Sequence, residues 1–228
     1  MRLAVIPARG GSKRIPRKNV RPFAGRPMIC HAIATARAAE VFTHIVVSTD
    51  DEEIAEVARR AGAELPFMRP AELATDHAGT LPVVAHALNQ ALALGWPVQQ
   101  VCCLYPAVPL LQAQDLRDAL DVLEQGDCEF VFPVLAFETP VQRALRRDAR
   151  GRVSALFPEH TATRTQDLEP AYHDAGQFYW GTTAAWLSGR SPHHGGRSLV
   201  LPPDRAVDID TPADWSRAEA LFNARQVL

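Results

Sequence analysis

The sequence lacks the features of a membrane, secreted or cysteine-rich protein. It has no run of about 20 apolar residues, which a membrane-spanning helix needs, and its opening, MRLAVIPARGG, turns polar too early for a signal peptide. Its four cysteines include no Cys-x-x-Cys pair and lie in apolar runs: Cys30, Cys102, Cys103 and Cys128. We therefore expect a cytoplasmic protein that has buried free thiols and no membrane partner.

The composition also excludes non-globular classes. Apolar residues make up 47% of the 228 positions and charged residues 22%, which is close to the globular average. A chain of this length buries about 70% of its unfolded surface on folding. Disorder, collagen and coiled coil are therefore excluded, and we expect one domain over residues 1–228, with or without an inserted arm.

Acidic residues are absent from the first 39 positions, which contain nine of the 24 basic residues. All 26 acidic residues lie in the remaining chain, so a positive beginning is followed by a negative remainder. Such asymmetry indicates an anionic ligand near the N-terminus. Because aromatic residues do not alternate with these charges, a small polyanion is favoured over a nucleic acid.

Apolar runs alternate with amphipathic stretches along most of the chain. Strands are predicted at 3–6, 44–48, 64–67, 100–105, 128–135, 177–180, 199–201 and 206–210, and helices at 27–40, 51–61, 80–94, 112–125 and from 212. This alternation is typical of an α/β protein, and we expect a Rossmann-like, mostly parallel sheet with helices on both faces.

The alternation stops at residues 137–175, which are polar and irregular. This stretch contains six arginines, at positions 143, 146, 147, 150, 152 and 164. Two interpretations remain open at this point: an arm of short strands inserted into the α/β domain, or a solvated hairpin.

Glycines and basic residues follow the first predicted strand, where open α/β sheets bind their ligands. Gly10 and Gly11 allow positive φ and let backbone N–H groups approach an anion closely. Ser12 adds a hydroxyl, and positive charge for a triphosphate comes from Arg9, Lys13 and Lys18. The P-loop motif and the G-x-G-x-x-G motif are both absent, which disfavours a P-loop NTPase and a Rossmann dehydrogenase. The alternative is a solvated surface loop.

The segment Ile6–Lys13 (IPARGGSK), together with Lys18 and Asn19, resembles the signature of the sugar-acid cytidylyltransferases, the CMP-sialic acid synthetase family. Further matches follow in the expected order at Val46–Asp50, Met68–Leu73 and Asp208–Thr211, so the resemblance covers nearly the whole chain. It implies a nucleotidyltransferase fold with an arm used for dimerisation. It also implies an enzyme that couples CTP to the anomeric hydroxyl of a sugar acid and releases pyrophosphate.

Residue roles are carried over from the family position by position. The triphosphate is expected to bind Arg9, Ser12, Lys13, Lys18 and Asn19 and the backbone of Gly10 and Gly11, and the cytidine to bind Ala8, Arg69 and Thr80. The expected catalytic residues are Arg9, Lys13, Asp208 and Asp210. Fixed cations suit this role because they stabilise the charge that develops on the leaving phosphate.

Asp208 and Asp210 end the predicted strand 206–210. Alternate residues of a strand point to the same side, so both carboxylates could ligate one Mg²⁺ ion together with phosphate oxygens. The resemblance implies the same metal role, and the alternative is a pair of exposed carboxylates. Asp214 is predicted to cap the last helix and to take no part in the chemistry.

The sequence departs from the sialic acid enzymes where the sugar is expected to bind. Tyr105 replaces their sugar-contacting glutamine, whereas the run Ala171–Gly181 (AYHDAGQFYWG) is similar to that of the pseudaminic acid cytidylyltransferases. The resemblance therefore favours pseudaminic acid as the substrate. The expected sugar contacts are Tyr105, Gln177 and Tyr179, with Arg143 or Arg164 at the sugar carboxylate.

Other functions remain open from the sequence. One is a cytidylyltransferase for legionaminic, N-acetylneuraminic or 3-deoxy-manno-octulosonic acid, and another is a module that senses CTP without turnover. Nucleic-acid binding is disfavoured by the acidic remainder of the chain. The family also implies a homodimer in which the arm of one chain reaches the sugar pocket of the other.

Overall fold

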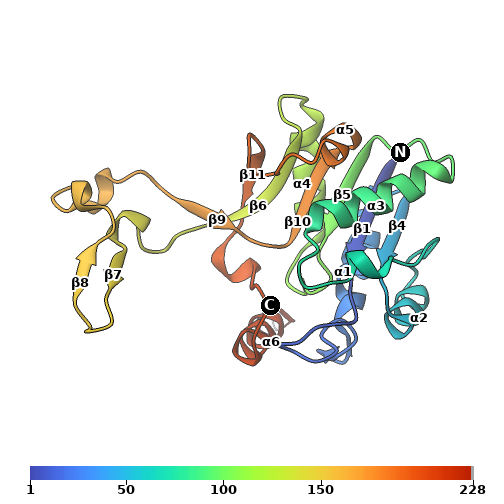
Figure 1. The fold of residues 1–228 in the computed structure, drawn as a ribbon, viewed down its shortest axis with the longest axis horizontal. Coiled ribbons are helices and arrows are strands. Elements are labelled where there is room, and N and C mark those ends of the chain that lie inside the picture. The colour runs from blue at the N-terminus through green and yellow to red at the C-terminus, as the bar shows by residue number, and fades with distance from the viewer. Residues whose placement is uncertain (227–228) are drawn as a thin grey trace.

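The centre of the molecule is a seven-stranded sheet (Figure 1). The computed structural model describes residues 1–226 of the chain. Across the sheet the strands are β11 (Arg197–Val200), β6 (Phe130–Ala136), β10 (Phe178–Thr182), β5 (Gln100–Leu104), β1 (Arg2–Pro7) and β4 (His44–Ser48), with β9 (Tyr172–Asp174) paired to β6. Parallel pairs join β1 to β4, β1 to β5 and β6 to β11, whereas β9 and β10 run antiparallel to their neighbours. The sheet is therefore mixed, and the prediction of a mostly parallel sheet is correct only in part.

The direction of β9 and β10 follows from the way the chain returns to the sheet. A parallel neighbour needs a crossover connection of a dozen or more residues, usually with a helix. After β6 the chain instead leaves the sheet and comes back along the same strand. There β9 pairs with residues 134–136 of β6 and β10 pairs with residues 130–131. Both strands therefore run antiparallel to β6.

Helices cover both faces of the sheet, as predicted. One face carries α1 (Met28–Ala39), α2 (Glu52–Arg60) and α4 (Ala113–Glu124), and the other carries α3 (Thr80–Ala93) and α5 (Thr183–Leu187). Side chains of β1 alternate between the faces: Ile6 lies in the cluster with α1 and α4, whereas Leu3 and Val5 lie in the cluster with α3.

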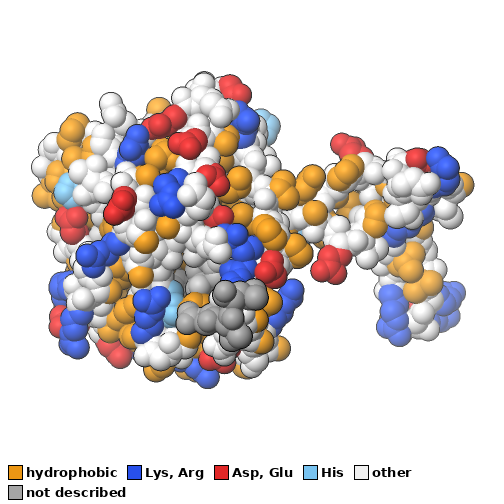
Figure 2. Space-filling view, turned by 180° about the vertical axis from the view of Figure 1, so that it is seen from behind, with side chains coloured by type: hydrophobic (Ala, Val, Ile, Leu, Met, Phe, Trp, Pro, Cys, Tyr) orange, Lys and Arg blue, Asp and Glu red, His pale blue; other side chains and the backbone are white. Residues whose placement is uncertain are grey.

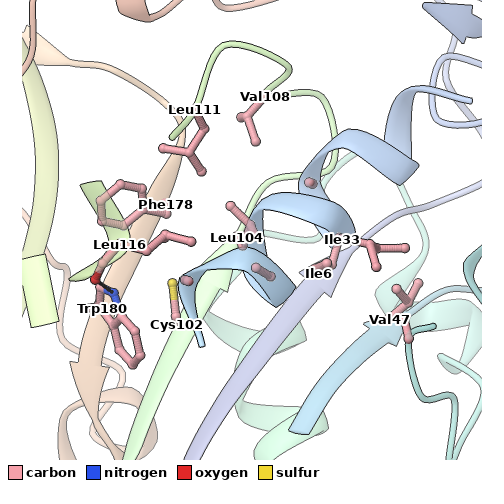
Figure 3. Close-up of a cluster of buried hydrophobic side chains, with 14 of the residues drawn as sticks. Ile6, Ile33, Val47, Cys102, Leu104, Val108, Leu111, Leu116, Phe178 and Trp180 are labelled. Carbon is pink, nitrogen blue, oxygen red and sulfur yellow. Dashed lines mark hydrogen bonds between the residues drawn. The ribbon is translucent and has the colours of Figure 1, made fainter. Parts of the chain in front are cut away.

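The core under α1 and α4 is built around large side chains of β10 (Figure 3). Phe178 and Trp180, which alternate with Tyr179 along the strand, are both 0% exposed. Trp180 also donates from Nε1 to the carbonyl of Leu116 in α4, at 3.0 Å. This hydrogen bond fixes α4 against β10.

The C-terminal helix packs beside the sheet on the segment that precedes α1. The short β2 (Pro22–Phe23) and β3 (Arg26–Pro27) precede α1, and α6 (Pro212–Gln226) packs on this segment (Figure 1). Phe23 is fully buried and contacts Trp215 of α6 edge to face, with ring centroids 5.3 Å apart. Ile209 is buried in the same cluster. The segment before α6 is thereby held against the loop that joins β1 to β2 (residues 8–21), which we call the basic loop.

Two predicted strands do not form. In 64–67 only Glu64 pairs, through an isolated bridge to Val46, and Pro66 lacks the N–H that a longer ladder needs. Residues 206–210 form no regular element. Their backbone is held by a side chain instead, because Lys18 Nζ donates to the carbonyl of Ile209 at 2.6 Å. The helix predicted from Pro27 begins at Met28, after a proline whose ψ of 139° is extended.

Residues 137–171 form an arm that projects away from the body and carries the hairpin of β7 (Leu145–Arg147) and β8 (Val153–Ala155) at its far end (Figure 1). Leu145 and Val153 of this hairpin are 60% and 61% exposed. Figure 2 shows exposed hydrophobic side chains along the arm and basic ones at the end of the hairpin. The hairpin at the end of this segment is therefore exposed in the single chain. Short 3-10 helices complete the chain: η1 (Ala71–Leu73), η2 (Val141–Arg143), η3 (Pro158–His160), η4 (Thr165–Asp167) and η5 (Pro203–Arg205).

All four cysteines are free thiols, as predicted. Cys102 and Cys103 of β5 are fully buried, whereas Cys30 and Cys128 are only partly buried, so the prediction of burial is correct for two of them. Among the helices of residues 1–226, none combines the length and apolar character needed to cross a membrane.

Candidate active site

A basic cleft of about 450 Å³ opens at the end of β1, where the glycine-rich loop leaves the sheet. We call it the basic cleft; it is lined by Pro7, Arg9, Ser12, Lys13, Arg14, Lys18, Asn19, Asp76, Pro106 and Asp210. Carboxyl ends of parallel strands are the usual ligand sites of α/β sheets. Five residues predicted to bind the triphosphate, namely Arg9, Ser12, Lys13, Lys18 and Asn19, are therefore brought together, and Asp210 joins them from the other end of the chain.

Gly10 and Gly11 do not adopt the positive φ that the sequence suggested. Gly10 is required for another reason: a Cβ at this position would lie 2.6 Å from Oδ2 of Asp51. Its N–H donates to Oδ1 of Asp50 at 3.0 Å, which ties the loop to the end of β4. A Cβ on Gly11 would meet no atom within 4 Å, so only Gly10 is constrained by close packing.

Asp51 holds the loop and α2 together. Its carboxylate accepts from the Ile54 N–H at 3.0 Å, as an N-cap of α2, and from Arg17 at 2.5 Å and 3.0 Å. The Arg17 guanidinium holds the pKa of Asp51 below its usual range. Arg17, with φ 55°, occupies the left-handed region in place of the glycines. The basic loop is thus fixed by ion pairs at its base.

The acidic segment before α6 reaches the basic cleft directly. Lys18 Nζ lies 3.3 Å from Oδ1 of Asp210, and Arg14 lies 2.7 Å from Oδ2 of the same carboxylate. Burial raises the pKa of Asp208, and the nearby charge of Asp210 raises it further. The two aspartates therefore interact, although they do not belong to a strand.

The aspartate pair fits a hard divalent cation. Within residues 1–226, no group of three or more His, Cys, Asp or Glu side chains is placed to hold a metal ion. Two carboxylates remain, and Mg²⁺ commonly binds one or two carboxylates together with phosphate oxygens and water. The like charges that raise the pKa of Asp208 are what a cation would neutralise. Asp210 lines the basic cleft, and Asp208 lines another cleft, of about 530 Å³.

The residues expected at the cytidine differ in accessibility. Arg69 is 6% exposed and donates to Ser48 twice, from Nε to Oγ at 3.1 Å and to the carbonyl at 2.5 Å. Burial lowers the pKa of Arg69. The Ala8 side chain is 0% exposed and packs in the core, so only its backbone could meet a base. Asn19, which was expected at the triphosphate, donates to the carbonyl of Arg9 at 3.0 Å, and its buried Oδ1 has no partner among the described residues.

A second, smaller cleft lies between β5, β10 and the start of α3. We call it the tyrosine cleft; it measures about 170 Å³ and is lined by Thr80, Leu81, Tyr105, Tyr179, Trp186, Ser191, Pro192 and His193. Tyr105 shares a hydrogen bond of 2.7 Å with Thr80, and Tyr179 donates to Asp174 at 2.6 Å. Burial raises the pKa of Tyr105 to about 12 and also raises that of Tyr179, so both phenols stay protonated. The two clefts come close at consecutive residues, because Tyr105 lines the tyrosine cleft and Pro106 lines the basic cleft.

Three of the predicted sugar contacts lie outside these clefts. Gln177 is 2% exposed and donates to the carbonyl of Arg205 at 2.8 Å, which gives it a structural place in the core. Arg143 donates to the carbonyl of His160 at 3.0 Å, within the arm. Arg164 pairs with Asp167 at 2.7 Å, also within the arm. Neither arginine reaches the basic or the tyrosine cleft of its own chain.

A family model described as cytidylyltransferase matches residues 3–185. The chain belongs to the cytidylyltransferase family. It is therefore a nucleotidyltransferase enzyme, and the basic cleft lies in the matched region except for Asp210.

Relatives and solved structures agree with this family. The pseudaminic acid cytidylyltransferase of Campylobacter jejuni is 42% identical over 223 residues, covering 96% of this chain and 95% of the relative. The CMP-N,N'-diacetyllegionaminic acid synthase of Legionella pneumophila is 33% identical over 233 residues, covering 98% and 97%. In fold, the cytidylyltransferase is similar to the structure of CMP:2-keto-3-deoxy-manno-octonic acid synthetase complexed with CTP, with a TM-score of 0.72, 17% identity, and 98% and 99% of the two chains covered.

Several residues of the cytidylyltransferase site were not found from the sequence. Arg14 could have been included with the other cations of its loop. Asp76 lies between two positions assigned to the nucleotide, Arg69 and Thr80, and this spacing was the available signal. His193 lies 2.5 Å from Asp174 at the tyrosine cleft, but nothing in the sequence places its loop there.

Proposed function

We propose that this cytidylyltransferase transfers CMP from CTP to the anomeric hydroxyl of a nonulosonic acid, with pseudaminic acid as the substrate. The observation that carries the proposal is the convergence of Lys13, Lys18 and Asp210 on one cleft beside the tyrosine cleft. The products are the CMP-sugar, pyrophosphate and a proton.

The nucleotide would bind with its phosphates on the basic loop. Arg9, Ser12 and Lys13 line the cleft from the loop itself and would hold the phosphates that leave. Lys18, anchored on the carbonyl of Ile209, would fix the α-phosphate near Asp210. The free Oδ1 of Asn19 would accept a hydrogen bond from the nucleoside. Such fixed donors act on developing charge without having to reorganise.

The reaction would proceed by in-line displacement. The anomeric oxygen forms a bond to the α-phosphorus, the bond from that phosphorus to the bridging oxygen of the β-phosphate breaks, and the hydroxyl proton is released. Asp208 and Asp210 would hold Mg²⁺, which when bound supplies positive charge at the α-phosphate and lowers the pKa of the attacking hydroxyl. Arg9 and Lys13 would stabilise the pyrophosphate as it leaves.

The tyrosine cleft supports the choice of sugar. Tyr105 and Tyr179 meet edge to face, with ring centroids 5.8 Å apart, and form an aromatic wall next to the basic cleft. Pseudaminic acid is deoxygenated at several positions, so an aromatic wall suits it better than an amide would. The Campylobacter relative carries the name of this activity. The alternative acceptor is a diacetyllegionaminic acid, after the Legionella relative.

The arm would complete the sugar site of a second copy in a homodimer. Its exposed Leu145 and Val153 supply apolar surface for the contact, and Arg143 and Arg164 would bring positive charge to the sugar carboxylate. Changing both Leu145 and Val153 to Asp should convert the dimer to a monomer in sedimentation equilibrium. The same substitution at Leu94, a 54%-exposed apolar residue of the body, should leave the mass unchanged. A wild-type chain that sediments as a monomer would rule out the dimer.

The proposed activity is tested by pyrophosphate release from CTP and Mg²⁺ with a panel of sugar acids. We expect kcat/KM for pseudaminic acid to exceed that for N-acetylneuraminic acid by at least about tenfold, the discrimination that an apolar pocket can provide. A higher value with N,N'-diacetyllegionaminic acid would replace the proposed acceptor. Tight CTP binding without pyrophosphate from any acid would indicate a CTP-sensing module instead.

A further inference from the structure

A carboxylate from outside the basic loop lines the basic cleft and pairs with two of its cations. Asp76 lies in the connection between η1 and α3. One of its oxygens pairs with Arg9, and the other lies 2.5 Å from Nζ of Lys13. These are the two cations assigned to the leaving phosphates. In this structure they are therefore already engaged by an anion of the chain itself.

The chemistry of this contact is that of a bound phosphate. Both oxygens of one carboxylate meet positive groups, as two oxygens of a phosphate would. The partners Lys13 and Arg9 hold the pKa of Asp76 at about 2, so it is ionised at every pH at which the enzyme works. Protonation therefore does not release it at neutral pH, whereas a competing anion or high salt can.

The contact is also able to open. The side chains of Arg9 and Asp76 are 35% and 36% exposed and that of Lys13 is 79% exposed, so solvent reaches all three. Backbone hydrogen bonds of the connection are local, from Ala74 to Ala71 and from Ala78 to Thr75. Exposed ion pairs contribute little to stability because water screens them. A triphosphate, with more charge and more oxygens, can displace such a partner.

We propose that Asp76 is an internal counter-ion: in the free enzyme it occupies the positions at Arg9 and Lys13 where the triphosphate would bind, and it is displaced when the nucleotide binds. The inference rests on the proposed function for the identity of the nucleotide, but the competition concerns any polyphosphate. Asp76 lowers the affinity for CTP and, by returning to Arg9 and Lys13, helps to expel pyrophosphate. If Asp76 instead oriented the two cations for the phosphates, its removal would weaken the binding of polyphosphates.

The test is the affinity of Asp76→Asn for inorganic tripolyphosphate, pyrophosphate and CTP, measured by isothermal titration calorimetry without metal. We expect the Kd of each to fall by about threefold to tenfold, since two exposed ion pairs no longer compete. The difference from wild type should shrink as salt is raised, because screening weakens the internal pairs as well. Glu72→Gln is the matched control: it removes the same charge from the exposed η1 nearby, and its affinities should stay within about twofold of wild type.

An unchanged or higher Kd of Asp76→Asn for tripolyphosphate would overturn the proposal. So would an equal gain in Glu72→Gln, because net charge alone would then explain the effect. Failure of the proposed function is distinguishable: a wild type that binds tripolyphosphate but prefers another nucleotide to CTP would contradict the cytidylyl transfer and leave the competition by Asp76 intact.

Discussion

Replacing Asp210 with Asn should lower the rate of pyrophosphate release by about 10²–10³-fold, the usual cost of removing one group that stabilises charge at the reacting centre. Asp210 is the one carboxylate that reaches the basic cleft from the C-terminal segment, and both of its oxygens meet cations, Lys18 and Arg14. Asn keeps the shape but not the charge. Lys18 still has the Ile209 carbonyl as a partner, so the loop should remain in place.

The control for this substitution is Asp204→Asn. Asp204 is 57% exposed, lies in η5 and pairs with Arg225 at 3.3 Å. It loses the same charge from the same part of the chain, and its rate should stay within about twofold of wild type. The Asp210 variant should also need more Mg²⁺ to reach half its maximal rate. A variant with a normal rate and a normal Mg²⁺ requirement would show that Asp210 does not bind the metal.

Replacing Trp180 with Ala should lower the free energy of unfolding by about 3–5 kcal/mol. The side chain is 0% exposed, stacks on Phe42 with ring centroids 5.0 Å apart, and bonds the carbonyl of Leu116. Alanine leaves a cavity between β10 and α4 that rigid strands and helices cannot close. Urea unfolding should show a lower midpoint and an unchanged slope.

Trp96→Ala provides the comparison for Trp180→Ala. Trp96 is only partly buried and stacks on His44, with ring centroids 3.7 Å apart. The same atoms are removed, but water can fill the space they leave, so the loss should be below about 2 kcal/mol. Equal losses in the two variants would show that burial in the core does not determine the contribution of Trp180.

The elements that can be predicted from the sequence are those in which local pattern and tertiary burial agree. Strand β4 and helix α2 follow from an apolar run and from a capped amphipathic stretch, and Phe178 and Trp180 from their alternation. The sequence of β10 itself does not show whether the strand runs parallel or antiparallel to its neighbours. It depends on where the arm returns to β6, which is a long-range pairing. The strand predicted at 206–210 failed for a similar reason, because a side chain, Lys18, binds the backbone where a neighbouring strand was expected.

The residues of the candidate site also fall into those that the sequence could predict and those that it could not. The charge asymmetry of the sequence predicts an anionic ligand for the basic loop, and that remains a prediction. In the structure the loop meets a carboxylate of the chain itself, because Lys18 and Asp210 are in contact. Asp76 and His193 come from connections whose course is set by packing. Only the position of Asp76 between Arg69 and Thr80 gives a signal for it, and no local pattern marks His193. Gln177 has the residue type of a sugar contact but turns into the core to meet Arg205. Residue type alone therefore does not say which way a side chain at a strand end will point.

The contact between Lys18 and Asp210 joins residues 192 positions apart, nearly the full length of the protein. A ribosome adds about 5–20 residues per second, so roughly 10–40 seconds separate the synthesis of the lysine from that of its aspartate. Throughout that interval the cations of the nascent chain lack the carboxylate that will complete their cleft. The basic cleft is thus among the last parts of the molecule to be assembled, and a polypeptide interrupted before Ile209 would contain the basic loop without the partner that anchors Lys18.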